Sequence, residues 1–62
     1  MKSYKTKDGN HSISIHNNGG SFLTIASQYG EYWFTVGTYK TEATALRHAK
    51  KSLARFGYEI AE

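Results

Sequence analysis

Residues 11–27 read HSISIHNNGGSFLTIAS and decide the fold of this chain. Polar and apolar residues alternate over 11–16, and this period of two is typical of a half-buried strand. Residues 17–20 (NNGG) predict a hairpin loop, because Asn and Gly adopt positive φ more readily than other residues. Residues 21–27 are rich in β-branched and aromatic types, which favour a second strand. The stretch therefore predicts an antiparallel hairpin.

The residues after this hairpin extend the sheet and then predict a helix. Residues 28–31 (QYGE) indicate a second turn, and 32–36 (YWFTV) a third strand. Loops this short join antiparallel neighbours only. Thr41 can cap a helix, because its hydroxyl can accept an N–H of the first turn. Gly57 is placed to end that helix. The apolar residues between them have helical spacing: Leu46, Ala49, Leu53 and Phe56.

The two ends of the chain are less regular. Residues 1–10 indicate a flexible arm or an edge strand, closed by a turn at 8–10 (DGN). Residues 58–61 (YEIA) alternate again and could return to the sheet as a short fourth strand. We therefore expect a single α+β domain over 1–62, a three-stranded antiparallel β-meander packed on one C-terminal α-helix in the order βββα.

Strict alternation assigns side chains to two faces of the sheet. The expected core combines one sheet face with the helix: Ile13, Ile15, Leu23, Ile25, Phe34, Val36, Leu46, Ala49, Leu53 and Phe56. The open face would be uncharged and show Ser12, Ser14, His16, Phe22, Thr24, Ala26, Trp33 and Thr35. Exposed Trp33 and Phe22 would mark a binding surface. Alternatively, the N-terminal arm covers this face, or Trp33 packs inward after a one-residue register shift.

Composition excludes several classes of protein. The chain has 62 residues, no Cys, no Pro and a net charge of +3. Without cysteine there is no disulfide framework and no Cys-based zinc site. No apolar run is long enough to span a membrane, and the polar start MKSYKTKDGN does not resemble a signal peptide. We expect a cytoplasmic protein, in the host cytoplasm if a phage encodes it.

Basic residues gather at the two ends of the sequence, because between residues 9 and 39 only Glu31 is formally charged. On the predicted helix a positive stripe has a spacing of four residues, with one further lysine alongside: Arg47, Lys51, Arg55 and Lys50. Such a stripe could bind phosphates. A solvated helix face that complements the helix dipole would have the same pattern.

Catalysis is not expected. His11 and His16 are five residues apart on a strand, so their side chains point to opposite faces. The residues at 19–20 (GG) belong to a hairpin turn and precede no helix, so they are not a phosphate-binding loop. We expect no enzyme activity, no cofactor and no metal.

Residues 36–41 (VGTYKT), followed by Ala45 and Ala49, resemble the strand-to-helix passage of AP2-type DNA-binding domains and of the arm-binding domains of phage integrases. Those families pack three antiparallel strands on one helix and read the major groove with the sheet. The resemblance implies a contact face with basic edges, formed here by Trp33, Thr35, Ser14, Lys5, Lys7 and Lys40. The chain departs from the family pattern because its three predicted strands contain no Arg or Lys.

The last third of the chain is similar in spacing to the small podophage inhibitors of bacterial RNA polymerase, which also place a strand after a helix. The likeness is carried by Thr41, Ala45, Leu46, Ala49 and residues 57–60. It implies an inhibitor that binds a host protein. Both resemblances point to bacteriophages or mobile elements.

Two functions of different classes are therefore expected. The first is a small accessory protein of a phage or mobile element that binds nucleic acid through basic residues and an aromatic sheet face. The second is a phage-encoded inhibitor that binds a host protein, RNA polymerase or a defence nuclease complex, through the neutral sheet face. The candidate binding residues are Trp33, Phe22, Thr35, Lys5, Lys7, Lys40, Arg47, Lys50, Lys51 and Arg55. A homodimer that buries the open face is compatible with either function.

Overall fold

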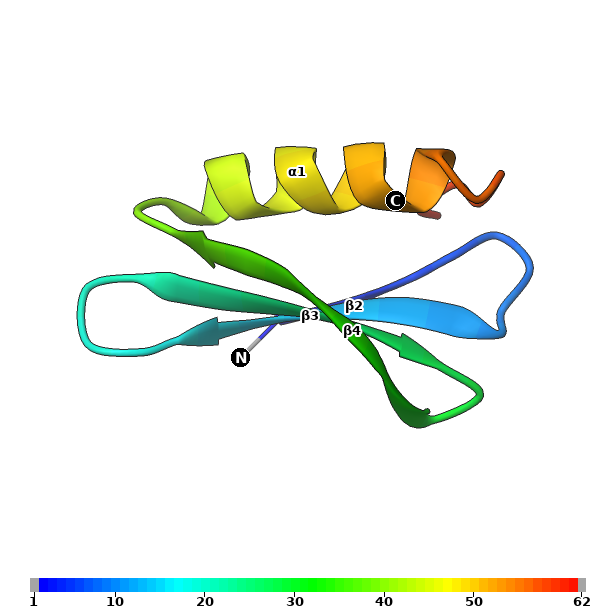
Figure 1. Cartoon of the computed structure of the whole chain (residues 1–62), viewed down its shortest axis with the longest axis horizontal. Coiled ribbons are helices and arrows are strands. Elements are labelled where there is room, and N and C mark those ends of the chain that lie inside the picture. Colours follow the sequence, from blue (N-terminus) through cyan, green and yellow to red (C-terminus); the bar gives the residue numbers. More distant parts are fainter. Residues whose placement is uncertain (1, 62) are drawn as a thin grey trace.

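A computed structural model describes residues 2–61 and contains one antiparallel sheet and one helix (Figure 1). The elements are β1 (Lys2–Lys5), β2 (His11–Asn17), β3 (Phe22–Gln28), β4 (Glu31–Tyr39) and α1 (Glu42–Ala54). The strands lie in the order β1-β2-β3-β4. The helix runs along one face of the sheet, and among residues 2–61 no element covers the other face (Figure 1). The α+β fold with a C-terminal helix is confirmed, with four strands in place of three.

The turns and the helix ends follow local sequence. Gly19 and Gly20 have φ values of 64° and 100° in the hairpin loop between β2 and β3. Thr41 caps α1, because its Oγ1 accepts a hydrogen bond from the Thr44 N–H at 3.1 Å. Gly57, with a φ of 84°, follows the helix. These local predictions are confirmed because each depends on residues a few positions apart.

Residues 5–7 and residues 59–61 lie side by side. Residues 2–5 form the edge strand β1, which is one of the two expected alternatives. The C-terminal segment forms a single antiparallel bridge, between Ile60 and Thr6, in place of a full strand. The Lys7 N–H donates to the Glu59 carbonyl at 2.8 Å, and the Ala61 N–H donates to the Lys5 carbonyl at 2.8 Å. The C-terminal segment therefore occupies backbone hydrogen-bonding groups at the end of β1 and directly after it.

The core lies between α1 and one sheet face. Its fully buried apolar side chains are Ile13, Ile15, Ala26, Ala45, Ala49 and Leu53. The two helix alanines are 0% exposed, so α1 approaches the sheet closely. Phe56 was expected in this core but is 56% exposed. It lies beyond the last residue of α1, where the turn toward Gly57 moves it away from the face that carries Leu53. Within residues 2–61 no helix has the length and apolar character needed to cross a bilayer.

The faces of β3 are the reverse of those expected. Ile13 pairs with Ala26 and Ile15 pairs with Thr24, so the even-numbered residues of β3 share the helix side with the odd-numbered residues of β2. Thr24 and Ala26 are buried, whereas Leu23 and Ile25 lie half-exposed on the open face. Apolar residues stand at both odd and even positions of β3, so alternation alone does not define its inner face. The hairpin loop defines it, because a one-residue change of register moves every side chain to the other face.

Two bulges interrupt the alternation of β4. Ala26 pairs with Phe34 and Ser27 pairs with Tyr32, which leaves Trp33 as an extra residue. A second shift leaves Val36 between two paired residues. A bulge places consecutive side chains out of strict alternation. Trp33 therefore packs against the core beside Phe34, and the expectation that it lies on the open face is wrong.

Candidate nucleic-acid interface

The predicted binding residues do not form one surface. Phe22 and Trp33 are half-buried and pack against the core on the helix side, so neither belongs to the open face. Thr35 is exposed and pairs with Ile25, which places it on the open face. Lys40 is exposed in the short connection before α1. The prediction of an aromatic face on the open side of the sheet is therefore wrong, because Phe22 and Trp33 both pack against the core.

Two basic residues of α1 and the C-cap residue that follows it form a ridge on the solvent side of the helix. Burial of Ala45, Ala49 and Leu53 orients the helix and turns its opposite side to solvent. The basic ridge consists of Arg47, Lys51 and Arg55, all exposed. Successive members are about one helical turn apart, about 6 Å along the axis at 1.5 Å per residue. Lys50 is also exposed and lies next to Lys51 in the helix.

Two carboxylates, one at each end of the C-terminal part of the chain that contains α1, are paired with lysines. Lys2 Nζ lies 3.0 Å from Glu42 Oε1, and Lys7 Nζ lies 2.9 Å from Glu59 Oε2. The hydrogen bond with Glu59 raises the pKa of Lys7, and the same contact lowers the pKa of Glu59. The predicted contact residue Lys7 is therefore engaged within the chain.

The basic ridge, by contrast, has no carboxylate partner in the described part of the chain. No ion pair within residues 2–61 includes one of its members. Of the acids in that range, Glu31 lies at the start of β4, next to the turn at the end of the sheet. The ridge is thus a row of exposed positive charges that no carboxylate of residues 2–61 pairs with.

The open face of the sheet is almost uncharged and rich in hydroxyl groups. The pairing places Lys5, Ser12, Ser27 and Tyr32 in one row across the four strands. In the next row Ile25 is flanked by serine and threonine, and the Tyr32 hydroxyl lies 2.9 Å from Thr35 Oγ1. Lys5 is the one lysine in these two rows, and it lies at the end of its row, on β1. This face therefore offers little charge for binding phosphates.

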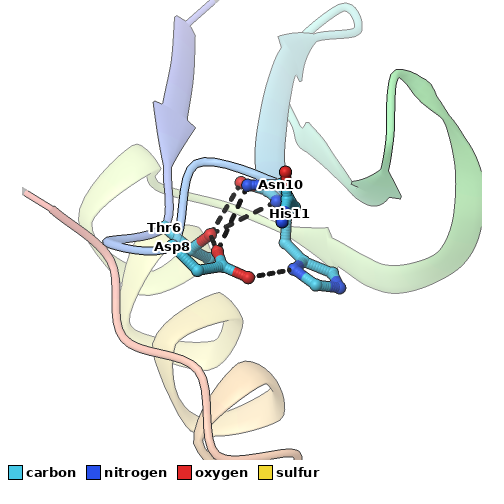
Figure 2. Close-up of polar contacts among 4 residues, drawn as sticks. All are labelled: Thr6, Asp8, Asn10 and His11. Atoms are coloured by element: carbon cyan, nitrogen blue, oxygen red, sulfur yellow. Dashed lines mark hydrogen bonds and ion pairs between the residues drawn. The ribbon is translucent and has the colours of Figure 1, made fainter.

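A polar cluster lies at the turn between β1 and β2 (Figure 2). The interpretation of the sequence did not predict it. Thr6 and His11 are each 3% exposed. The Thr6 hydroxyl donates to Asp8 Oδ1. His11 Nδ1 lies 2.9 Å from Asp8 Oδ2. The Thr6 hydrogen bond, helped by the Asn10 N–H and by His11, lowers the pKa of Asp8.

This cluster orients the turn between β1 and β2. Asp8 lies between the Thr6 hydroxyl and the His11 ring, so the hydroxyl is not paired with the imidazole as a nucleophile would be with its base. The His11 ring stacks on Tyr58 with centroids 3.9 Å apart. Among residues 2–61 no three His, Cys, Asp or Glu side chains gather in a way that could hold a metal. The local signal was the short spacing of Thr6, Asp8 and His11 around a turn.

Three aromatic rings meet where α1 ends. The Trp33 centroid lies 4.9 Å from that of Phe56 and 4.8 Å from that of Phe34. Phe34 and Phe56 are 5.9 Å apart. We call Trp33, Phe34 and Phe56 the aromatic patch. It lies on the helix side of the sheet, and Phe56 is its most exposed member at 56%.

Comparison with protein-family models, with curated proteins and with solved structures gave no match. The two resemblances described above remain predictions.

Proposed function

We propose that this protein binds nucleic acid and that the basic ridge of α1 contacts backbone phosphates. The observation that carries the proposal is the set of three exposed cations, Arg47, Lys51 and Arg55, that no carboxylate of residues 2–61 neutralises. Cations that contact phosphates release condensed counterions, which supplies most of the affinity of non-specific binding. The expected cytoplasmic location, in a host cell if a phage encodes the chain, would give access to such a partner.

A purely structural role explains the ridge incompletely. Cations in the last turn stabilise a helix through its dipole, and this accounts for Lys51 and Arg55. Arg47 lies in the middle of the helix, Glu42–Ala54, where the dipole effect has largely decayed. No carboxylate of residues 2–61 pairs with the Arg47 charge, and the helix dipole does not account for it. An external anion would supply the missing partner.

A pair of matched triple variants tests this proposal. The ridge variant removes all three charges of the ridge and combines Arg47→Gln, Lys51→Gln and Arg55→Gln. The control variant removes three charges elsewhere and combines Lys2→Gln, Lys5→Gln and Lys7→Gln. Both variants lower the net charge of +3 by the same amount. Gln is a good helix former, so α1 should persist. We expect the ridge variant to lose binding to a labelled oligonucleotide and its salt dependence to become shallower by about 2 to 3 in slope.

Fluorescence anisotropy over a salt series measures both quantities, and circular dichroism checks that each variant is folded. The control variant should retain most of the affinity, because Lys2 and Lys7 are held in internal ion pairs. Equal losses in the two variants would mean that only net charge matters, and the ridge would no longer be a binding site.

A protein partner is the second candidate, and the open sheet face favours it. Leu23 and Ile25 are half-exposed there without packing on the core, and Tyr32 is 66% exposed. A nearly uncharged face of this kind suits a partner protein with an apolar, uncharged contact surface. Ile25→Lys should abolish capture of such a partner from nuclease-treated lysate in high salt, whereas the ridge variant should not. Loss of capture in the ridge variant alone would reject this role for the open face.

A further inference from the structure

Phe56 is exposed at a position where its sequence pattern predicts burial. It continues the apolar helical spacing of the core, yet 56% of its surface is accessible. Its N–H donates to the Leu53 carbonyl at 2.9 Å, and the Tyr58 N–H donates to the same carbonyl at 3.1 Å. These bonds fix the turn after α1 and hold the Phe56 ring against Trp33. The turn therefore holds the exposed Phe56 ring next to two partly exposed rings, and contiguous exposed apolar patches can mark binding sites.

The basic ridge leads to this patch. Arg55 directly precedes Phe56, and it stands seven residues, about two turns, after His48. The His48 ring stacks on Tyr39 of β4 at 4.5 Å and 10°, so this side of α1 faces β4. Arg55 consequently projects from the side of the helix nearest the strand that carries Trp33. The last cation of the ridge is therefore the chain neighbour of Phe56, the exposed ring of the aromatic patch.

We infer that the nucleic acid bound by the ridge is single-stranded and that an unpaired base stacks on the aromatic patch at Phe56 and Trp33. This inference rests on the proposed function. Proteins that bind single strands combine cationic grooves for the backbone with aromatic side chains on which bases stack. In a duplex the base faces are hidden within the stack, so a patch of aromatic rings would gain nothing from it. The open face offers less to a single strand, because its rows carry one lysine, Lys5, and one exposed ring, Tyr32, at opposite ends of a row of four residues.

The chain contains a built-in reporter, since Trp33 is its only tryptophan. Oligo(dT) and a duplex of the same length, at equal phosphate concentration and low salt, are the probes. We expect oligo(dT) to bind more tightly than the duplex and to quench the fluorescence of Trp33, and the duplex to leave the fluorescence nearly unchanged.

Phe56→Leu keeps an apolar side chain and removes the aromatic face. It should weaken oligo(dT) binding about fivefold or more, because stacking of one base contributes about 1–3 kcal/mol. Tyr32→Leu is the matched control, because it removes a ring of similar exposure, 66%, from the opposite face. It should leave both the affinity and the quenching unchanged.

The outcomes separate this inference from the proposed function. The inference is overturned if oligo(dT) and duplex bind alike, Trp33 fluorescence does not change and Phe56→Leu has no effect. If the ridge variant still loses binding in that case, the proposed function of the ridge is retained. If neither probe binds at low salt, the proposed function itself fails. If Phe56→Leu is unfolded by circular dichroism, the quenching of Trp33 by oligo(dT) over duplex in the unmodified chain still decides the question.

Discussion

At the scale of single residues, Asp8 joins Thr6, Asn10 and His11 at the turn between β1 and β2. It accepts hydrogen bonds from the Thr6 hydroxyl and from the Asn10 N–H at 3.3 Å, and it lies 2.9 Å from His11 Nδ1. These contacts require the carboxylate form, and they lower the pKa of Asp8 from its ordinary value of 3.8. Folding and ionisation of this group are therefore linked.

This linkage predicts acid sensitivity. A lowered native pKa means that the stabilisation is fully present above 3.8 and is lost as the pH falls through the native value. We expect the melting temperature to fall in this acidic range and Asp8→Asn to show a flatter profile with lower stability near neutral pH. Thermal melts from neutral pH to strong acid measure this. Glu31→Gln, which removes a carboxylate without a hydrogen bond in residues 2–61, should follow the unmodified chain; a similar flattening there would reject Asp8 as the source.

At the scale of elements, the register of β3 has a measurable consequence. Ile15 of β2 is 2% exposed in the core, while Ile25 of β3 lies half-exposed on the open face. Truncation of a buried isoleucine removes apolar contacts and leaves a cavity, but truncation at an accessible site leaves neither effect in full.

We therefore expect Ile15→Ala to lower the free energy of unfolding by about 2–5 kcal/mol and Ile25→Ala to lower it by less than about 1 kcal/mol. Urea denaturation of both variants gives the comparison under identical conditions. Equal costs, or a larger cost at Ile25, would contradict the observed register and favour the faces expected from simple alternation.

At the scale of the whole molecule, the C-terminal segment joins parts of the chain that are far apart in sequence. The Tyr58 ring stacks on His11 of β2 at 3.9 Å, and its N–H donates to Leu53 of α1 at 3.1 Å. Ile60 packs against the core from the same segment. In a domain of this size the core is small, so each such connection is a large share of the total stability.

Tyr58→Ala should consequently destabilise the whole fold, by about 2–3 kcal/mol, since it removes a half-buried ring that contacts both layers. Tyr58→Phe keeps the ring and should remain close to the unmodified chain. Thermal melts followed by circular dichroism and by Trp33 fluorescence should report one common transition. In Tyr58→Ala, the change in Trp33 fluorescence on melting could be lost while the circular dichroism midpoint stays at the value of the unmodified chain. That result would show that the C-terminal segment only covers the surface and does not stabilise the fold.

The candidate site could be predicted only in part from sequence. The spacing of Arg47, Lys51 and Arg55 is local and indicated the ridge correctly. That no carboxylate of the described residues pairs with the ridge could not be foreseen, because it depends on pairs such as Lys7 with Glu59, which are distant in sequence. The exposure of Phe56 was likewise decided by the turn that follows α1.

Local sequence alone determined the hairpin loop, the cap at Thr41, the helix and its buried side, because those features depend on neighbours within about one turn. Tertiary structure decided which residues of β3 face the helix and where Trp33 lies. Apolar residues occupy both faces of β3, and two bulges break the alternation of β4. The packing of distant strands and the helix selects the register among arrangements that period-two patterning leaves equivalent.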